Sequence, residues 1–293
     1  MDFFLPTRVY SDFNGYDNII DLFNDIEEFS DDEIVLDFIH TNWFEANLSA
    51  ILGAICILYR EQGKEVRVRN INQTIEDVLC RNHFLCEFNY YGFIDTKGTI
   101  LTYQMFSPYQ DIEFLKYIDN ELLSKPDFPR HSKILGKKIN ESIFELFENA
   151  RTHGNCKHIF TCGQYYPNKY KGKRLDITIV DLGITIKRNV NEYLQKELTG
   201  YEAIEWAMQY GNTTKRGNVS GGLGLDIVKA FINLNKGKIQ IVSANGYWEF
   251  SNGRTFKNTF SNSFPGTIVN IEFNLNDKHS YQFKEEISLD NIF

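Results

Sequence analysis

Residues 145–150 read Glu-Leu-Phe-Glu-Asn-Ala and lie near the end of a long helical pattern that starts at Ser132 and stops at Gly154. Glu145 and Asn149 are four residues apart, so we expect both side chains on one face of the helix. An amide oxygen such as that of Asn149 suits Mg²⁺, a hard cation that prefers oxygen ligands. A carboxylate one turn earlier could polarise a water or a hydroxyl beside a phosphate. The stretch is consistent with a metal and phosphate site, and also with the solvated edge of an ordinary helix.

A second polar group follows a predicted hairpin with strands at 158–165 and 174–180. Asp181-Leu182-Gly183 stands at the end of the second strand. A carboxylate that leaves a buried strand can accept hydrogen bonds from an exocyclic amine, and a nearby glycine lets a flat ring approach the backbone. Asp and Gly are also common in ordinary turns. Thr267 begins the predicted strand 266–273, where its hydroxyl could share a hydrogen bond with such a ring.

A glycine-rich stretch, Ser220-Gly221-Gly222-Leu223-Gly224-Leu225, comes immediately before a predicted helix at 224–235. Glycines at a helix start expose backbone N–H groups, which together with the helix dipole can hold phosphates. The stretch is not a P-loop, because no Gly-Lys pair in this chain is followed by Ser or Thr. It also does not follow a strand directly, as a dinucleotide-binding fingerprint would.

Taken together, these pieces occur in the order and spacing of the GHKL ATPase superfamily, which residues 132–275 resemble. The superfamily includes gyrase, the MutL repair proteins, histidine kinases and anti-sigma kinases. The matched positions are Glu145 and Asn149 for the N-box, Asp181 and Gly183 for the G1 box, Gly222 and Gly224 for the G2 box, and Thr267 for the final strand. The resemblance implies a Bergerat α/β sandwich, with helices on one face of a mixed sheet, and an ATP lid at about 187–220.

The same resemblance implies a role for each matched residue. Asn149 would ligate Mg²⁺, Asp181 would bind the adenine amine, and Gly183 would leave room for the base. Glu145 would be the general base; many histidine kinases have asparagine at this place, so the glutamate favours hydrolysis or Ser/Thr phosphorylation. The phosphates and the nucleotide would be held by backbone or side-chain groups of Gly221, Gly222, Leu223, Gly224 and Thr267.

The lid carries two further features. Lys215 and Arg216 are candidates to neutralise the γ-phosphate, and they are equally consistent with a solvated loop. The family's G1 box reads Asp-x-Gly-x-Gly, whereas this chain has Thr185 in the second glycine place. That difference predicts a stiffer hinge for the lid.

The first hundred residues predict alternating strands and helices. Helical patterns cover 17–29, 46–62 and 73–84, and strand patterns cover 33–40 and 64–69. Parallel strands joined by right-handed crossovers follow from that order. Residues from about 30 to 105 are similar in pattern to a STAS-like domain. STAS antagonists carry a phosphorylatable serine in an Asp-Ser-Ser-Gly turn; here the nearest hydroxyl, Ser49, lies within a predicted helix.

Length and composition fit this division. The chain has 293 residues, 42% hydrophobic and 24% charged, which excludes wholesale disorder and suggests about two domains. We expect an α/β fold with a STAS-like domain at 1–105, a connecting segment at 106–130 and an ATP-binding domain at 131–293. No apolar stretch approaches the roughly 20 residues of a membrane helix, and the N-terminus lacks the basic region of a signal peptide. A cytoplasmic protein without a membrane segment is therefore predicted.

The charge and the cysteine content limit the kinds of partner and metal site that we expect. Residues 1–100 hold 7 Lys+Arg and 18 Asp+Glu, so the first domain is an acidic surface for a protein partner, and the net charge of -8 argues against non-specific nucleic-acid binding. Homodimers are common in the resembled family. Two groups could offer zinc ligands, although buried structural thiols are the commoner outcome: Cys80, His83 and Cys86, and Cys156, His158 and Cys162.

The sequence thus predicts a protein that binds ATP and Mg²⁺. A slow ATPase whose nucleotide state switches a partner interaction is the leading interpretation. A serine/threonine protein kinase of the anti-sigma type and a non-catalytic nucleotide sensor are the alternatives. A histidine kinase is disfavoured, because His131 stands in the sequence Arg130-His131-Ser132-Lys133, without the acidic residue that typically follows a phosphoacceptor histidine.

Overall fold

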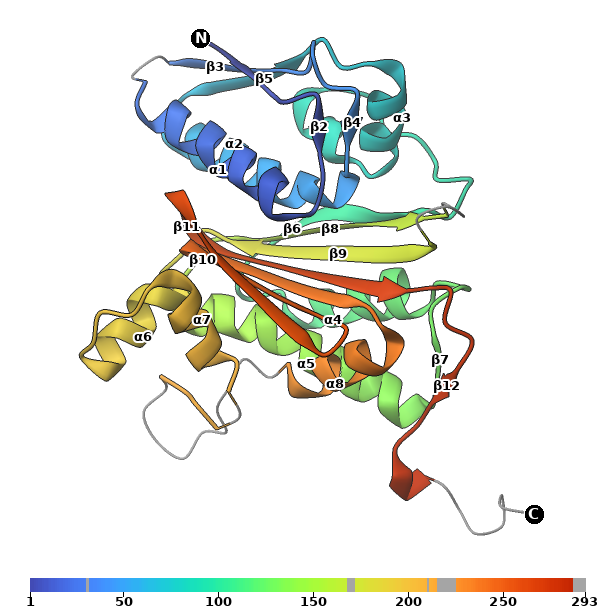
Figure 1. Cartoon of the computed structure of the whole chain (residues 1–293). Coiled ribbons are helices and arrows are strands. Elements are labelled where there is room, and N and C mark those ends of the chain that lie inside the picture. The colour runs from blue at the N-terminus through green and yellow to red at the C-terminus, as the bar shows by residue number, and fades with distance from the viewer. Residues whose placement is uncertain (30–31, 168–171, 210, 215–224, 287–293) are drawn as a thin grey trace.

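The computed structural model describes residues 1–29, 32–167, 172–209, 211–214 and 225–286. The chain is α/β, and its elements stack in layers: a small sheet, a layer of helices, a five-stranded sheet and a second layer of helices (Figure 1). Within the described ranges, no helix is both long and apolar enough to cross a membrane.

The first layer is a parallel sheet. Its order is β1-β3-β5, formed by β1 (Asp2–Phe4), β3 (Glu33–Asp37) and β5 (Glu65–Arg69). The connections are helical: α1 (Phe13–Glu27) lies between β1 and β3, α2 (Ser49–Glu61) between β3 and β5, and α3 (Gln73–Arg81) follows β5. A short pair is formed by β2 (Arg8–Val9) and β4 (Trp43–Phe44). The parallel strands and crossover helices expected from the sequence are confirmed.

The larger sheet has the order β10-β11-β9-β8-β6. Its strands are β6 (Ile100–Phe106), β8 (Ile159–Tyr166), β9 (Arg174–Asp181), β10 (Lys238–Ser251) and β11 (Arg254–Asn274). All of its described pairs are antiparallel, so the expectation of a mixed sheet was wrong. The reason is local, because β8 and β9, like β10 and β11, follow each other along the chain and pair as hairpins.

Three strands differ from the predicted pattern. β10 and β11 keep pairing beyond a bulge near Ala244 and form a long two-stranded arm, whereas the sequence predicted only 237–243 and 266–273. β6 pairs with β8 and so belongs to the larger sheet. The domain boundary expected at residue 105 therefore falls inside β6.

One face of the larger sheet is covered by α4 (Asp111–Tyr117), α5 (Lys133–Asn149) and α8 (Asp226–Asn235). The predicted connecting segment 106–130 takes part in this layer, since α4 buries Phe114 against Phe147 of α5, with ring centroids 4.9 Å apart. Helices α6 (Ile186–Leu194) and α7 (Gly200–Ala207) pack beside β10. The short strands β7 (Arg130–His131) and β12 (Ser280–Tyr281) pair near the end of the described chain.

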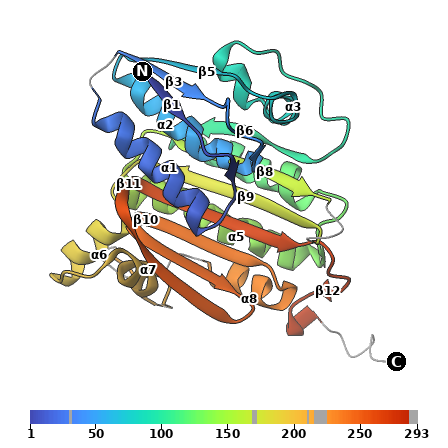
Figure 2. The ribbon, with the colours of Figure 1, turned by 45° about the horizontal axis from the view of Figure 1, so that its top comes forward.

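The other face of the larger sheet is covered by α1 and α2, as Figure 2 shows from a second direction. Helices were expected on one face only, and that expectation was wrong. Strand β9 gives the physical reason, because successive residues alternate between the two cores: Ile179 packs in the core with α5, and Val180 packs in the core with α2. One face of this strand is apolar, with Leu175, Ile177 and Ile179, and the other buries Val180 together with the polar side chains of Asp176 and Thr178, so both faces are covered.

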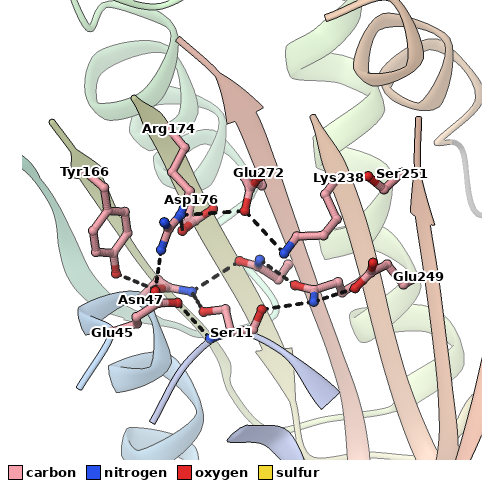
Figure 3. Close-up of polar contacts among 12 residues, drawn as sticks. Ser11, Glu45, Asn47, Tyr166, Arg174, Asp176, Lys238, Glu249, Ser251 and Glu272 are labelled. Carbon is pink, nitrogen blue, oxygen red and sulfur yellow. Dashed lines mark hydrogen bonds and ion pairs between the residues drawn. The ribbon is translucent and has the colours of Figure 1, made fainter. Parts of the chain in front are cut away.

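A polar network joins the segments that precede α1 and α2 to the larger sheet (Figure 3). Asn47, fully buried before α2, donates to Ser11 Oγ at 2.8 Å and to Thr178 Oγ1 at 2.9 Å, and accepts from the Tyr166 hydroxyl at 3.1 Å. Arg174 forms ion pairs with Glu45, Asp176 and Glu272. The bonds of Asn47 are buried and the Arg174 ion pairs are part-buried, so the network fixes how the two parts of the chain meet.

Candidate functional site

A cavity of about 80 Å³ lies where α5 ends, beside the ends of β9 and β11 and helices α6 and α7. Its volume holds roughly five water molecules. Much of its wall is apolar, and three of the polar residues that line it are Asn149, Asp181 and Thr267. These three come from three separate stretches of sequence, and the structure brings them together as the sequence predicted for a common site.

Asp181 contributes a buried carboxyl group to this cavity. It is the last residue of β9, 6% exposed, and its Oδ1 has no hydrogen-bond partner among the described residues. Burial raises the pKa of Asp181 to about 7, while a hydrogen bond from the backbone N–H of Gly183 opposes that rise. A buried carboxyl oxygen without a partner is costly in a folded protein, so a ligand donor at this oxygen would be strongly favoured.

Glycines let the backbone close tightly around Asp181. A Cβ on Gly183 would lie 2.2 Å from the carbonyl oxygen of Gly154, and that carbonyl accepts a hydrogen bond from the Ile184 N–H at 2.7 Å. A Cβ on Gly266 would lie 1.9 Å from the carbonyl oxygen of Asp181. Gly183 therefore has a packing requirement, because a side chain there would push the end of α5 away from β9.

Thr267 is placed by the sheet register. It pairs with Asp181 on one side and with Ser243 on the other, so the three residues lie in a row across three neighbouring strands. The hydroxyl oxygens of Thr267 and Ser243 are 3.2 Å apart, and Ser243 Oγ accepts from the Ile186 N–H at 2.9 Å. This row connects the cavity floor to the start of α6.

Helix α5 separates the two residues that the sequence placed together. Asn149 ends the helix and lines the cavity, whereas Glu145, four residues earlier, is exposed and lies outside the cavity lining. Ser132 begins the helix as its N-cap and accepts from the Leu135 N–H at 3.1 Å. Of the two residues, Asn149 is therefore the one that lines the cavity.

Thr185 has a local role of its own. It has an extended backbone, with φ -67° and ψ 153°, and its Oγ1 accepts from the Arg188 N–H at 3.2 Å as the N-cap of α6. No left-handed conformation is required there, so the position does not need a glycine. The predicted lid, 187–220, begins with this capped helix, and α7 packs on the β10–β11 arm through the contact of Gly200 with Gly246.

Several predicted residues lie outside the described ranges: Lys215, Arg216, Gly221, Gly222, Leu223 and Gly224. Other residues of the cavity were not expected from the sequence. His153 lines it, with Nδ1 3.0 Å from Thr214 Oγ1, and Trp206 of α7 lies at its wall. His153 follows Asn149 by four residues, and that spacing was the available signal.

The polar groups of the cavity fit an adenine base better than they fit a metal ion. The Asp181 oxygen can accept from an amine, and the apolar wall suits a ring, whereas Asn149 is the one predicted Mg²⁺ ligand among the described residues. No group of three His, Cys, Asp or Glu side chains with metal-binding geometry occurs in the described ranges. Four cysteines, Cys56, Cys80, Cys156 and Cys162, are buried free thiols, and Cys86 is an exposed one.

No protein-family model matches the chain, and no curated protein matches it at a significant level.

The buried Asp181 carboxyl makes stability depend on pH. Its pKa of about 7 lies above the value near 4 of an unfolded aspartate, so the folded chain holds the proton more tightly and loses stability as pH rises through that window. Asparagine at position 181 cannot ionise. We therefore expect the free energy of unfolding of Asp181→Asn, relative to the wild type, to rise by about 2 kcal/mol between pH 5 and pH 7. Urea unfolding at both pH values measures this, and a difference that does not change with pH would contradict it.

Proposed function

We propose that this chain binds ATP and Mg²⁺ in the cavity at the end of β9, with a Bergerat-type arrangement of the GHKL kind, and that it is a slow ATPase. The nucleotide state would switch a partner interaction, and the acidic STAS-like module at the N-terminus would provide the partner surface. The observation that carries the proposal is the buried Asp181 carboxyl, whose unpartnered oxygen shares one cavity with Asn149 and Thr267.

Each described residue supports a separate part of this proposal. Asp181 Oδ1 would accept a hydrogen bond from the exocyclic amine of adenine, and Thr267 would hold the base edge from the neighbouring strand. Asn149 would offer its amide oxygen to Mg²⁺, which would supply positive charge to neutralise the phosphates. Leu146, Ile179 and Trp206 would exclude water from the ring.

One observation favours the second candidate function, a non-catalytic nucleotide sensor. Glu145 is exposed, does not line the cavity, and has no position fixed by a described contact with that cavity. A general base must come within hydrogen-bond reach of the water that it activates. In the sensor, ATP would bind without turnover, and the lid helices would report its presence.

Phosphate release from Mg-ATP by the purified chain tests these functions. We expect slow release by the wild type and at least about a tenfold loss in Glu145→Ala, since removal of a general base costs roughly two to four orders of magnitude. Glu141→Ala is the matched control, because Glu141 lies one turn earlier on α5 and pairs on the surface with Lys137 and Lys138. Its rate should equal that of the wild type.

The other outcomes select among the alternatives. ATP binding in a thermal-shift assay without phosphate release would reject the ATPase and support the sensor. Labelled phosphate on a partner protein would select the serine/threonine kinase instead. Absence of ATP binding by the wild type would reject the nucleotide site altogether.

A further inference from the structure

An open groove of about 610 Å³ lies between strand β1 and helix α1, on the layer farthest from the nucleotide cavity. One wall is β1 with the residues that follow it, and the other wall is the face of α1 that carries Asn18, Asp21, Leu22 and Asp25. The spacing of these four residues places them on one side of the helix. The groove thus joins the edge of a sheet to the side of a helix.

The strand in this groove has an unused edge. β1 is the outermost strand of the order β1-β3-β5, with β3 as its one partner among the described residues. The Val35 N–H donates to the Met1 carbonyl at 2.9 Å, and the Leu5 N–H donates to the Asp37 carbonyl at 3.1 Å. In a parallel ladder with this register, the N–H and C=O groups of the intervening residues, Asp2 and Phe4, point away from β3. Such an edge can pair with another chain.

The lining of the groove combines apolar side chains with acidic ones. Phe4 is 55% exposed and Phe29 40% exposed, and the Phe29 ring lies 5.8 Å from that of Phe3. The acidic residues of the lining are Asp2, Asp21, Asp25 and Glu28, and the lining contains neither Lys nor Arg. Asp2 forms an ion pair with Arg69, whereas Asp25 and Glu28 form none with the described residues.

We propose that this groove binds an extended segment of a partner protein in which basic residues alternate with apolar ones, added as a strand to the edge of β1. The proposal names the kind of partner that the acidic module would take in the function proposed above. Strand addition gives affinity through main-chain hydrogen bonds and specificity through alternate side chains. A segment of this pattern would place its basic side chains toward α1 and its apolar side chains against Phe4, because Phe3 faces α1 and successive residues of a strand face opposite ways.

A second copy of this chain fits the groove less well. Edge-to-edge pairing of two β1 strands would bring the acidic residues of two grooves together, and like charges in contact oppose association. A basic segment instead gains from the carboxylates of Asp25 and Glu28, so its affinity should fall with added salt.

Fluorescence anisotropy with the full chain and no nucleotide tests the proposal. The probe is a labelled eight-residue peptide of alternating Lys and Val, and the controls are the Glu-Val peptide and a Lys-Val peptide methylated at alternate backbone nitrogens. We expect the Lys-Val peptide to bind at least about tenfold more tightly than either control.

Substitutions in the groove test whether the peptide binds there. Asp25→Lys combined with Glu28→Lys should weaken the peptide at least about tenfold, whereas Glu113→Lys, an exposed charge reversal on α4, should leave it unchanged. Phe4→Pro removes an outward N–H that β3 does not use, so it should fold and yet weaken the peptide more than Phe4→Ala does. Melting temperatures establish that each variant is folded.

Three results would overturn the proposal: equal binding of the Glu-Val peptide, wild-type affinity in the Asp25/Glu28 and Phe4→Pro variants, or self-association of the chain that Phe4→Pro abolishes. The assay contains no nucleotide, so a negative result would reject the groove without bearing on ATP binding.

Discussion

Asp181→Asn should weaken ATP binding by at least about 100-fold while leaving the chain folded. The reason lies in the two carboxyl oxygens. The backbone N–H of Gly183 hydrogen-bonds this carboxyl, and Oδ1 has no partner in the described structure. Asparagine would turn its amide oxygen to the Gly183 N–H and so place its NH₂ group where Oδ1 was. That NH₂ would meet the adenine amine donor to donor, and a charge-assisted bond would be lost.

The same reasoning predicts a change in base preference. ITP carries a carbonyl oxygen where ATP has the amine, and the asparagine NH₂ can donate to that oxygen. We therefore expect the ratio of ITP affinity to ATP affinity to rise by at least about 100-fold in Asp181→Asn. A site built to hydrogen-bond one polar group discriminates strongly against its opposite.

Isothermal titration calorimetry of both nucleotides against both proteins measures this ratio. Loss of folding would not imitate the result, because it would weaken both nucleotides rather than raise the ratio of ITP affinity to ATP affinity. Thr267→Val is a matched control, since it alters the neighbouring strand without changing the group that faces the amine. It should weaken both nucleotides alike. An unchanged ratio in Asp181→Asn would show that Asp181 does not contact the base.

Asn47→Leu should lower the free energy of unfolding by about 3–5 kcal/mol. Asn47 is fully buried between the start of α2 and the larger sheet, and it bonds to Ser11, Thr178 and Tyr166. Leucine has a similar volume but no polar atom, so it leaves the buried hydroxyls of Ser11 and Tyr166 without these bonds, whereas Thr178 keeps its bond to Asn270 Oδ1 at 2.8 Å. Each such group costs roughly 1–3 kcal/mol. The loss exceeds that of a typical surface substitution several times over.

Urea unfolding followed by circular dichroism measures the change. Asn42→Leu is the control, because it makes the same chemical replacement at an exposed position on the same connection, and its effect should stay below about 0.5 kcal/mol. Equal stability of Asn47→Leu and the wild type would show that water replaces the lost bonds, and that the network does not hold the two layers together.

The local elements of this fold could be predicted from the sequence, and their neighbours in the sheet could not. The apolar stripe at 17–29 and the alternation at 64–69 correspond to α1 and β5, because periodicity reports which face is buried. The arm formed by β10 and β11 was missed beyond residue 243, since its polar residues and glycines hide the strand pattern. Seven of the eight residues of β9 are buried, but its Arg, Asp and Thr residues interrupt the apolar run, so the sequence did not indicate a sheet covered on both faces.

The site could be predicted in part for a similar reason. Asp181 and Thr267 are 86 positions apart and meet through strand register, which a single sequence does not specify. Their resemblance to family motifs placed them in one site, and the structure brings them to one cavity together with Asn149. Glu145 could not be placed, because a helical spacing of four gives a shared side of the helix but not whether that side is covered.

Each face of the larger sheet packs in a different hydrophobic core, and this affects how the chain unfolds. Val180 and Ile179 are neighbours in sequence, yet they belong to different cores, so neither core can lose its order while β9 stays paired and dry. Amide hydrogens of β9 should exchange slowest of all, at the rate of global unfolding. Heating should melt both halves in one transition, and a fragment that ends at residue 105 would expose the side of α2 that β8 and β9 cover.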